Sequence, residues 1–231
     1  MVQARFALYF TPAPDSRLAR FGTAILGYDC DLGAPVPQRR LDGIDPAAAV
    51  RAAAEPARYG FHGTLMAPFE LAPGQTADTL TAALAAFARR RAPVSLGRLK
   101  VAPIGGFTAL VPAGRQDAVG VLAGDCLTAF DGFRAPPTPQ DRARRLAAGL
   151  SRRQIELLDR WGYPYVLEEF RFHMTLTGRL PPDEQARWQA ALADAFAPLA
   201  DEPVEIDAVS LLRQDGRAAR FCVIARQPLH G

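Results

Sequence analysis

The sequence predicts an α+β fold of two pseudo-symmetric lobes, each with an antiparallel or mixed sheet and flanking helices, and a cleft between them. The first reason is a phrase that occurs twice, FHGTL at 61–65 and FHMTL at 172–176, with its histidines 111 positions apart (173 − 62 = 111). The second is that a helix and two strands are predicted after each phrase, which is typical of an internal repeat. The third is that adjacent hairpins argue against a wholly parallel sheet. We therefore expect one bilobal domain over residues 1–231, with interleaved lobes.

The first half of the chain contains well-marked starts and stops. Aromatic residues at 5–11 predict a central strand, which a proline-rich turn ends. Asp15 or Ser16 can cap a helix that runs to about residue 28. Prolines and glycines at 29–44 predict a loop. The other predicted elements are an Ala-rich helix at 45–54, the first motif strand ending at Pro68, a helix at 76–91, and strands at 94–102 and 107–112.

The second half repeats this plan after a helix at 116–130. Residues 135–160 contain three prolines and then an arginine-rich helical pattern, and we expect this stretch to connect the lobes. A Trp-Gly-Tyr-Pro-Tyr break at 161–165 precedes the second motif strand. The remaining predicted elements are that strand at 169–177, a helix at 183–196, and strands at 204–212 and 220–225 around an Asp215-Gly216 turn.

Composition excludes several classes of function. The 27 basic and 24 acidic residues give a formal charge of +3, too small to imply polyanion binding by charge alone. Lys100 is the only lysine, and it does not stand in the setting that a P-loop or a Schiff-base enzyme needs. Three isolated cysteines argue against disulfides and against a CxxC motif. With no targeting segment or long apolar run, we expect a cytoplasmic protein without a membrane partner.

The two motifs are the candidate site. In a strand, the histidine and threonine of each motif share one face, and the phenylalanine and leucine share the other. If the lobes pack about a twofold axis, His62, Thr64, His173 and Thr175 surround one small cavity. A neutral imidazole accepts a proton and an imidazolium donates one, so the pair can serve as base and acid at a phosphorus centre. The threonine hydroxyls can donate to nonbridging oxygens.

Structural and metal-binding roles are the other readings of these histidines. A lone histidine in an apolar strand is usually a core residue, but here the same frame occurs twice in a chain with three histidines. A zinc site needs at least three ligands at characteristic spacings, and the sequence contains no HxH, HExxH or CxxC. We therefore expect no metal, and we expect His230 to lie in a solvated tail.

The motif blocks resemble the 2H phosphoesterase superfamily, which is named for two His-x-Thr/Ser motifs in two pseudo-symmetric lobes. Residues 58–71, beginning RYGFHGTL, and 161–180 are similar to one branch, the phosphonate-operon-associated proteins of unknown function (DUF1045-like). The resemblance spans essentially the whole chain, including the Tyr-Phe-Thr-Pro at 9–12. One departure is Gly63, where the superfamily usually has a hydrophobic residue. It lies on the core side of the strand, so the departure concerns packing.

The resemblance implies a metal-independent cyclic phosphodiesterase without a cofactor. His62 and His173 would exchange base and acid roles, and Thr64 and Thr175 would hold the phosphate. Phosphonate breakdown yields a ribose 1,2-cyclic phosphate that carries a 5-phosphate, which is a plausible substrate. We expect further substrate contacts from Tyr9, Tyr59, Arg144 and Arg171, the last because it lies two residues before His173 on the same strand face.

Two other functions stay open. One is a 2′,3′-cyclic phosphodiesterase of RNA ends, and the other is a noncatalytic sensor of a phosphate ligand. Nucleic acid is the less expected partner, because the sequence shows no repeated interleaving of aromatic and basic residues. We expect a monomer that binds a small cyclic phosphate.

Overall fold

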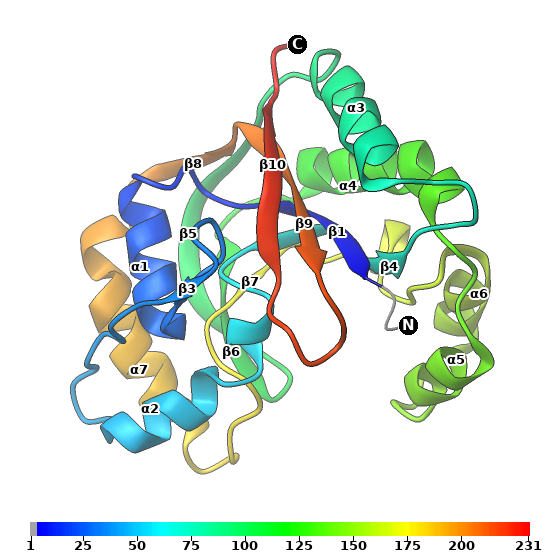
Figure 1. Cartoon of the computed structure of the whole chain (residues 1–231). Coiled ribbons are helices and arrows are strands. Elements are labelled where there is room, and N and C mark those ends of the chain that lie inside the picture. The colour runs from blue at the N-terminus through cyan, green and yellow to red at the C-terminus, as the bar shows by residue number, and fades with distance from the viewer. Residues whose placement is uncertain (1–3) are drawn as a thin grey trace.

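The computed structural model describes residues 4–231 and confirms the predicted α+β class (Figure 1). Eight strands form one sheet, and all of its neighbouring strands are antiparallel. These strands are β1 (Arg5–Phe10), β4 (Gly63–Glu70), β5 (Val94–Ile104), β6 (Phe107–Pro112), β7 (Met174–Thr175), β8 (Pro203–Ile206), β9 (Ala208–Gln214) and β10 (Cys222–Pro228).

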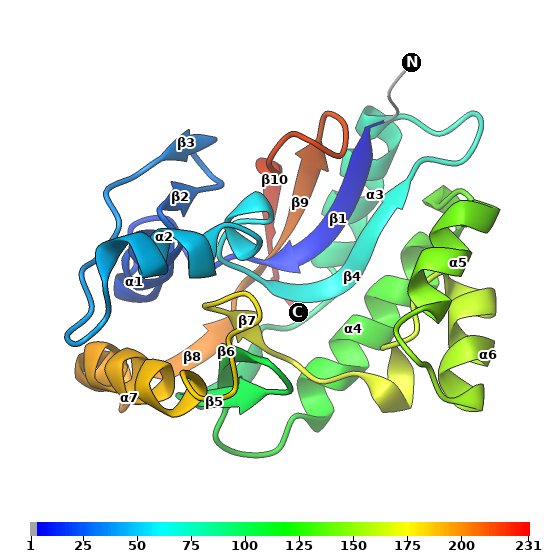
Figure 2. The same ribbon diagram turned by 90° about the horizontal axis from the view of Figure 1, so that it is seen from below.

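Helices cover the sheet on two sides of the molecule. They are α1 (Arg17–Leu26), α2 (Pro46–Ala53), α3 (Ala77–Ala88), α4 (Asp117–Phe130), α5 (Pro139–Leu146), α6 (Arg152–Trp161) and α7 (Gln185–Phe196), with short 3-10 turns at Pro56–Arg58, Asp131–Phe133, Leu167–Glu169 and Ala197–Leu199. Figures 1 and 2 show α1, α2 and α7 on the side opposite α4, α5 and α6. Within residues 4–231, none of the helices is long and apolar enough to cross a membrane.

The sheet divides into two halves of four strands that meet at the motif strands. The strand order is β10-β9-β1-β4-β7-β6-β5-β8. The hairpin that follows each motif lies in the half that contains the other motif, β5 and β6 beside β7, and β9 and β10 on the side of β4. At the junction Gly63 pairs with Met174, its own counterpart in the repeat (174 − 63 = 111). The pseudo-twofold axis therefore passes between these two residues.

Helix boundaries follow local sequence signals closely. The Ser16 side chain accepts from the backbone N–H of Ala19 at the start of α1, and Gly27 ends that helix with φ 68°. Asp45 caps α2, with Pro46 at its first position. The predicted loop at 29–44 is wrong in part, because Tyr28–Asp29 (β2) and Ala34–Pro35 (β3) pair as a small separate ribbon.

The predicted motif strands are wrong in extent. β4 begins at Gly63, after His62, and continues through Pro68. Proline is tolerated there because three β4 steps, from Met66 to Phe69, face two steps of β1, which places Pro68 in an irregular part of the ladder. The second strand, predicted over nine residues, is only Met174–Thr175.

Another correction concerns the strand predicted at 204–212. It breaks at Asp207, so that β8 pairs with β5 in one half and β9 pairs with β1 in the other. The strand predicted at 220–225 is β10, which begins two residues later. The chain thus crosses between the halves at Asp207.

The two motif phenylalanines are buried and press against glycines. A Cβ atom on Gly22 would lie 2.0 Å from the Phe61 ring, and one on Gly63 would lie 2.4 Å from the Phe172 ring. A larger residue at position 63 would therefore overlap Phe172. This packing accounts for the glycine in the first motif.

Candidate active site

The strand register brings the four polar motif residues together. Continuing the Gly63–Met174 pairing by one position on each side sets His62 opposite Thr175, and Thr64 opposite His173. Thr64 and Thr175 lie in β4 and β7, and His62 and His173 immediately precede these strands. All four are half-buried between buried neighbours, the alternation expected of residues on one face. The charge of His173 also lowers the pKa of His62, as expected for neighbouring imidazoles.

Each imidazole is oriented by a carbonyl two residues earlier in the chain. His62 Nδ1 lies 2.9 Å from the Gly60 oxygen, and His173 Nδ1 lies 2.8 Å from the Arg171 oxygen. A carbonyl oxygen only accepts, so Nδ1 carries the proton in both rings and Nε2 has the lone pair in the neutral state. Both rings can therefore exchange protons through Nε2. In this structure the Thr64 hydroxyl lies 3.1 Å from His62 Nε2.

Position 60 requires a glycine, both because of its backbone conformation and because of the side chain packed against it. Its φ of +75° directs the carbonyl back to His62, and a Cβ there would lie 2.5 Å from the Cys30 side chain. The positioning of His62 therefore depends on Gly60, which no other residue can replace without strain.

Aromatic rings support both histidines. Tyr9 stacks on His62 with centroids 3.7 Å apart, and Phe107 lies 5.6 Å from His173. Tyr9 is fully buried, and burial raises its pKa well above the ordinary value. Tyr59 lies 6.3 Å from His62 and stacks on Phe221. Each imidazole therefore has an aromatic ring beside it.

Burial favours the neutral form of both histidines. It lowers the pKa of His62 to about 4, against a smaller opposing effect of the Gly60 hydrogen bond. It also lowers the pKa of His173, opposed by the hydrogen bond to the Arg171 carbonyl. A bound anion between the rings would raise both pKa values, because it stabilises the imidazolium form.

A cavity of about 550 Å³ opens beside the first motif. His62 and Thr64 line it, and no aspartate or glutamate is among its lining residues. Five arginines and three tyrosines make up most of the wall, which comprises Arg5, Tyr9, Arg58, Tyr59, Ala67, Pro68, Arg144, Arg145, Tyr163 and Arg217. The cavity is therefore suited to an anionic ligand.

The predicted substrate contacts are only partly brought together. Tyr9, Tyr59 and Arg144 line the cavity with His62. The structure does not support a place for Arg171 on the strand face, because it precedes β7, is exposed, and does not line the cavity. Its carbonyl, not its side chain, serves His173.

The remaining arginines of the wall were missed by sequence reasoning. Arg5 lies an even number of strand positions before Tyr9, and this spacing could have placed it on the same face. Arg145 lies within the arginine-rich stretch already noted. Arg58 and Arg217 gave no signal that separates them from surface arginines.

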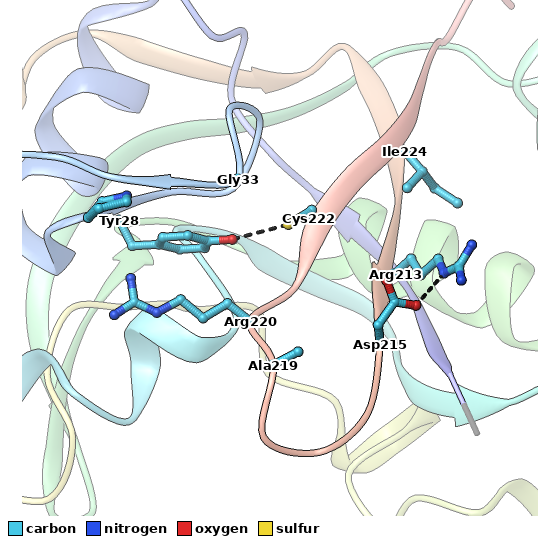
Figure 3. Close-up of a pocket in the computed structure, with 9 residues that line it drawn as sticks. Tyr28, Gly33, Arg213, Asp215, Ala219, Arg220, Cys222 and Ile224 are labelled. Carbon is cyan, nitrogen blue, oxygen red and sulfur yellow. Dashed lines mark hydrogen bonds and ion pairs between the residues drawn. The ribbon is translucent and has the colours of Figure 1, made fainter. Parts of the chain in front are cut away.

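A second cavity, of about 430 Å³, lies between the β2–β3 ribbon and β10 (Figure 3). The Tyr28 hydroxyl lies 3.2 Å from Cys222 Sγ there, and the Arg220 guanidinium lies 4.6 Å from the Tyr28 ring. Neither motif histidine lines this cavity. It therefore does not belong to the paired-histidine site.

In the part of the chain that the structure describes, no three His, Cys, Asp or Glu side chains come together as a metal ion would need.

Paired His-x-Thr segments meet at the Gly63–Met174 pair of an antiparallel sheet in an α+β fold. A family model described as "Protein of unknown function (DUF1045)" matches residues 64–222. The chain belongs to the DUF1045 family.

Two curated relatives carry the same name, "Ribose 1,5-bisphosphate phosphokinase PhnN". The protein from Janthinobacterium sp. (strain Marseille) is 40% identical over 231 residues, 98% of this chain and 51% of the relative. The protein from Laribacter hongkongensis (strain HLHK9) is 41% identical over 218 residues, 94% of this chain and 50% of the relative. The chain thus spans about half the length of the curated relatives it matches.

Solved structures show only distant likeness. A conserved protein of unknown function from Agrobacterium tumefaciens str. C58 gives a TM-score of 0.49 at 13% identity, over 97% of this chain and 86% of that one. E. coli LigT complexed with NADP+ gives 0.44 at 12% identity, over the whole of both chains.

Proposed function

We propose that this protein is a metal-independent cyclic phosphodiesterase that acts on a small cyclic sugar phosphate. The observation that supports it most is the matched pair of imidazoles, each with Nδ1 held by a carbonyl and Nε2 left for proton exchange. Two such groups on one face, beside an arginine-lined cavity, supply a base, an acid and an anion site.

The deeper burial of His62 suits it to the role of base. Its Nε2 takes a proton from water as the water oxygen attacks phosphorus. The ester oxygen leaves on the opposite side and takes a proton from His173 Nε2. One P–O bond forms and one breaks, water is consumed, and proton exchange with solvent restores both rings. The pKa of His173 is lowered in the free protein. The bound anion must therefore raise this pKa, so that His173 is protonated when the substrate is in place.

The threonines are proposed to hold the nonbridging oxygens. In the free protein the Thr64 hydroxyl contacts His62 Nε2, so substrate binding requires this hydroxyl to turn toward phosphate. Thr175 lies opposite His62 in the register and offers the equivalent donor. Each contributes a neutral hydrogen bond, weaker than a charged one.

The substrate class follows from the cavity and its charge. A volume of about 550 Å³ lies within the usual ~300–1,000 Å³ of small-molecule sites. Ribose 1,2-cyclic phosphate 5-phosphate, in phosphonate breakdown, is our leading candidate. The curated relatives are named for ribose 1,5-bisphosphate, another doubly phosphorylated ribose. Their kinase activity is not proposed for this chain, whose only lysine, Lys100, lies in β5 and not in a P-loop.

RNA-end hydrolysis is the second candidate, and one observation favours it. The fold gathers three tyrosines and five arginines in one cavity, although the sequence keeps them apart. Their rings are already engaged, however, Tyr9 on His62, Tyr59 on Phe221 and Tyr163 beneath Arg145. Few ring faces are left on which bases could stack.

The test is a panel of cyclic phosphates followed by phosphorus NMR, with and without chelator. We expect turnover of cyclic ribose phosphates that chelator does not affect. Faster hydrolysis of a 2′,3′-cyclic RNA end than of any cyclic ribose phosphate would favour the RNA-processing function. Binding of the panel without turnover would favour a sensor.

A further inference from the structure

We propose that the arginine wall of the histidine cavity is a second anion site, in which Arg5 and Arg145 bind a terminal phosphate of the substrate. This inference rests on the proposed function for the reaction at the histidines. It adds that the substrate carries two phosphates, a cyclic diester at His62 and a monoester at the arginines.

The charge balance of the wall supports an anionic ligand. Among the ion pairs of residues 4–231, Asp141 is the only carboxylate that pairs with any of the five arginines. It lies 2.6 Å from Arg144 and 2.7 Å from Arg217. Within residues 4–231, none of Arg5, Arg58 and Arg145 forms an ion pair, so three of the five guanidinium groups have no directly paired carboxylate.

Arg5 and Arg145 are both partly buried. Burial lowers the pKa of both arginines. The charge of Arg217 lowers the pKa of Arg5 further, and that of Arg144 lowers the pKa of Arg145 against an opposing effect of Asp141. Partly burying a cation without a counterion is costly, and a bound phosphate would offset that cost. These two positions therefore gain most from an anion.

Neutral groups hold both guanidinium groups in place without cancelling their charge. Arg5 Nε donates to Gln214 Oε1 at 2.8 Å, and Arg145 lies 4.8 Å above the centre of the Tyr163 ring. Tyr59 lines the same cavity as both arginines. Planar guanidinium groups held in this way suit the bidentate binding of phosphate oxygens.

The second arginine is delivered by an element that contributes little to the core. Helix α5 has no fully buried residue, and its Asp141 forms an ion pair with Arg217, which lines the cavity. Because Arg145 of α5 and Arg5 of β1 line the same cavity as His62 and Thr64, the second anion belongs to the molecule whose cyclic phosphate lies at the histidines.

The test measures binding rather than turnover, with D-ribose 5-phosphate and D-ribose as probes in isothermal titration calorimetry. We expect the wild-type protein to bind ribose 5-phosphate at least tenfold more tightly than ribose. Arg145→Met and Arg5→Met should each weaken ribose 5-phosphate binding at least tenfold, and Arg145→Lys should weaken it less, because a lysine keeps the charge but loses the fork. Arg152→Met, at an exposed arginine of α6, is the matched control and should bind as wild type.

The inference is overturned if the two probes bind equally, or if the Arg145→Met and Arg5→Met proteins bind ribose 5-phosphate like wild type. Tighter binding of a 2′,3′-cyclic dinucleotide, lost in Arg145→Met, would assign the wall to a nucleic-acid backbone and also overturn it. Circular dichroism checks folding, and Arg145 is the safer position because no residue of α5 is fully buried. If no cyclic phosphate is hydrolysed but the arginine dependence holds, the proposed reaction fails and the anion site stands.

Discussion

Replacing His62 by asparagine should remove part of the acid sensitivity of this protein. Burial lowers the pKa of His62 from 6.5 to about 4 in the folded state. Between these values the unfolded chain binds more protons than the folded one, so the free energy of unfolding falls as the pH falls from 6.5 toward 4. Above pH 6.5 His62 is neutral in both the folded and the unfolded chain, so the free energy of unfolding is not reduced by its titration. Asparagine does not titrate, and its amide can still donate to the Gly60 carbonyl.

The size of the effect follows from the two pKa values. The difference between 6.5 and about 4 corresponds to about 3.5 kcal/mol at most, since each pKa unit is worth about 1.4 kcal/mol. Between pH 7 and pH 4.5 most of that difference is lost, roughly 2–3 kcal/mol. Wild type should therefore lose roughly 2–3 kcal/mol more than His62→Asn over this interval.

Urea unfolding at the two pH values, followed by tryptophan fluorescence, measures this difference. Carboxylates with lowered pKa also destabilise the fold in acid, but they do so equally in both proteins. His230→Asn is the matched control, since His230 is exposed near the end of the chain, and it should behave as wild type. Equal acid losses in wild type and His62→Asn would show that the folded protein accepts a proton on His62 easily, and would remove the reason for assigning it as the base.

Three further results are expected. His62→Ala and His173→Ala should each stay folded and lose at least ~10²-fold in kcat, the scale of acid–base catalysis, and near-wild-type turnover in either would disprove the paired mechanism. The pH profile of kcat/KM should be bell-shaped and insensitive to EDTA. The rate should rise with pH through about pH 4 as His62 loses its proton, and should fall again as His173 loses its proton, at a pH below the ordinary imidazole pKa. A single rising limb with chelator sensitivity would instead indicate a metal-bound hydroxide. Gly63→Ala should lower the free energy of unfolding by about 1–3 kcal/mol through overlap with Phe172, and Phe172→Leu should restore part of it; additive losses in urea unfolding of the double variant would contradict that contact.

Local rules recovered much of the fold from the sequence. The caps at Ser16 and Asp45 and the hairpin of β5 and β6 depend on neighbours a few residues away, so their signals are readable in one chain. The repeated motif also predicted the axis, because a shift of 111 positions returns Gly63 to its own partner. These features needed no knowledge of tertiary packing.

Tertiary placement set the limit. Arg171 was assigned to a strand face by parity, but strand β7 begins only at Met174. Arg171 lies before that strand, and its carbonyl accepts a hydrogen bond from the His173 ring. Arg5 and Arg145 are 140 positions apart (145 − 5 = 140), and only the fold brings them to one cavity. No local pattern distinguishes them from arginines that merely cover the surface.

The repeat makes the two histidines equivalent in sequence, and the surroundings make them different. Tyr9 stacks on His62, whereas Phe107 is only tilted beside His173, and the arginine-lined cavity includes His62 and Thr64 but neither His173 nor Thr175. A substrate with two phosphates would then bind in one orientation, because its second phosphate has arginines on only one side. A fixed orientation assigns each imidazole to one oxygen of the phosphorus centre. On this reasoning the asymmetric wall fixes the orientation of the substrate, and the deeper burial of His62 suits it to act as the base.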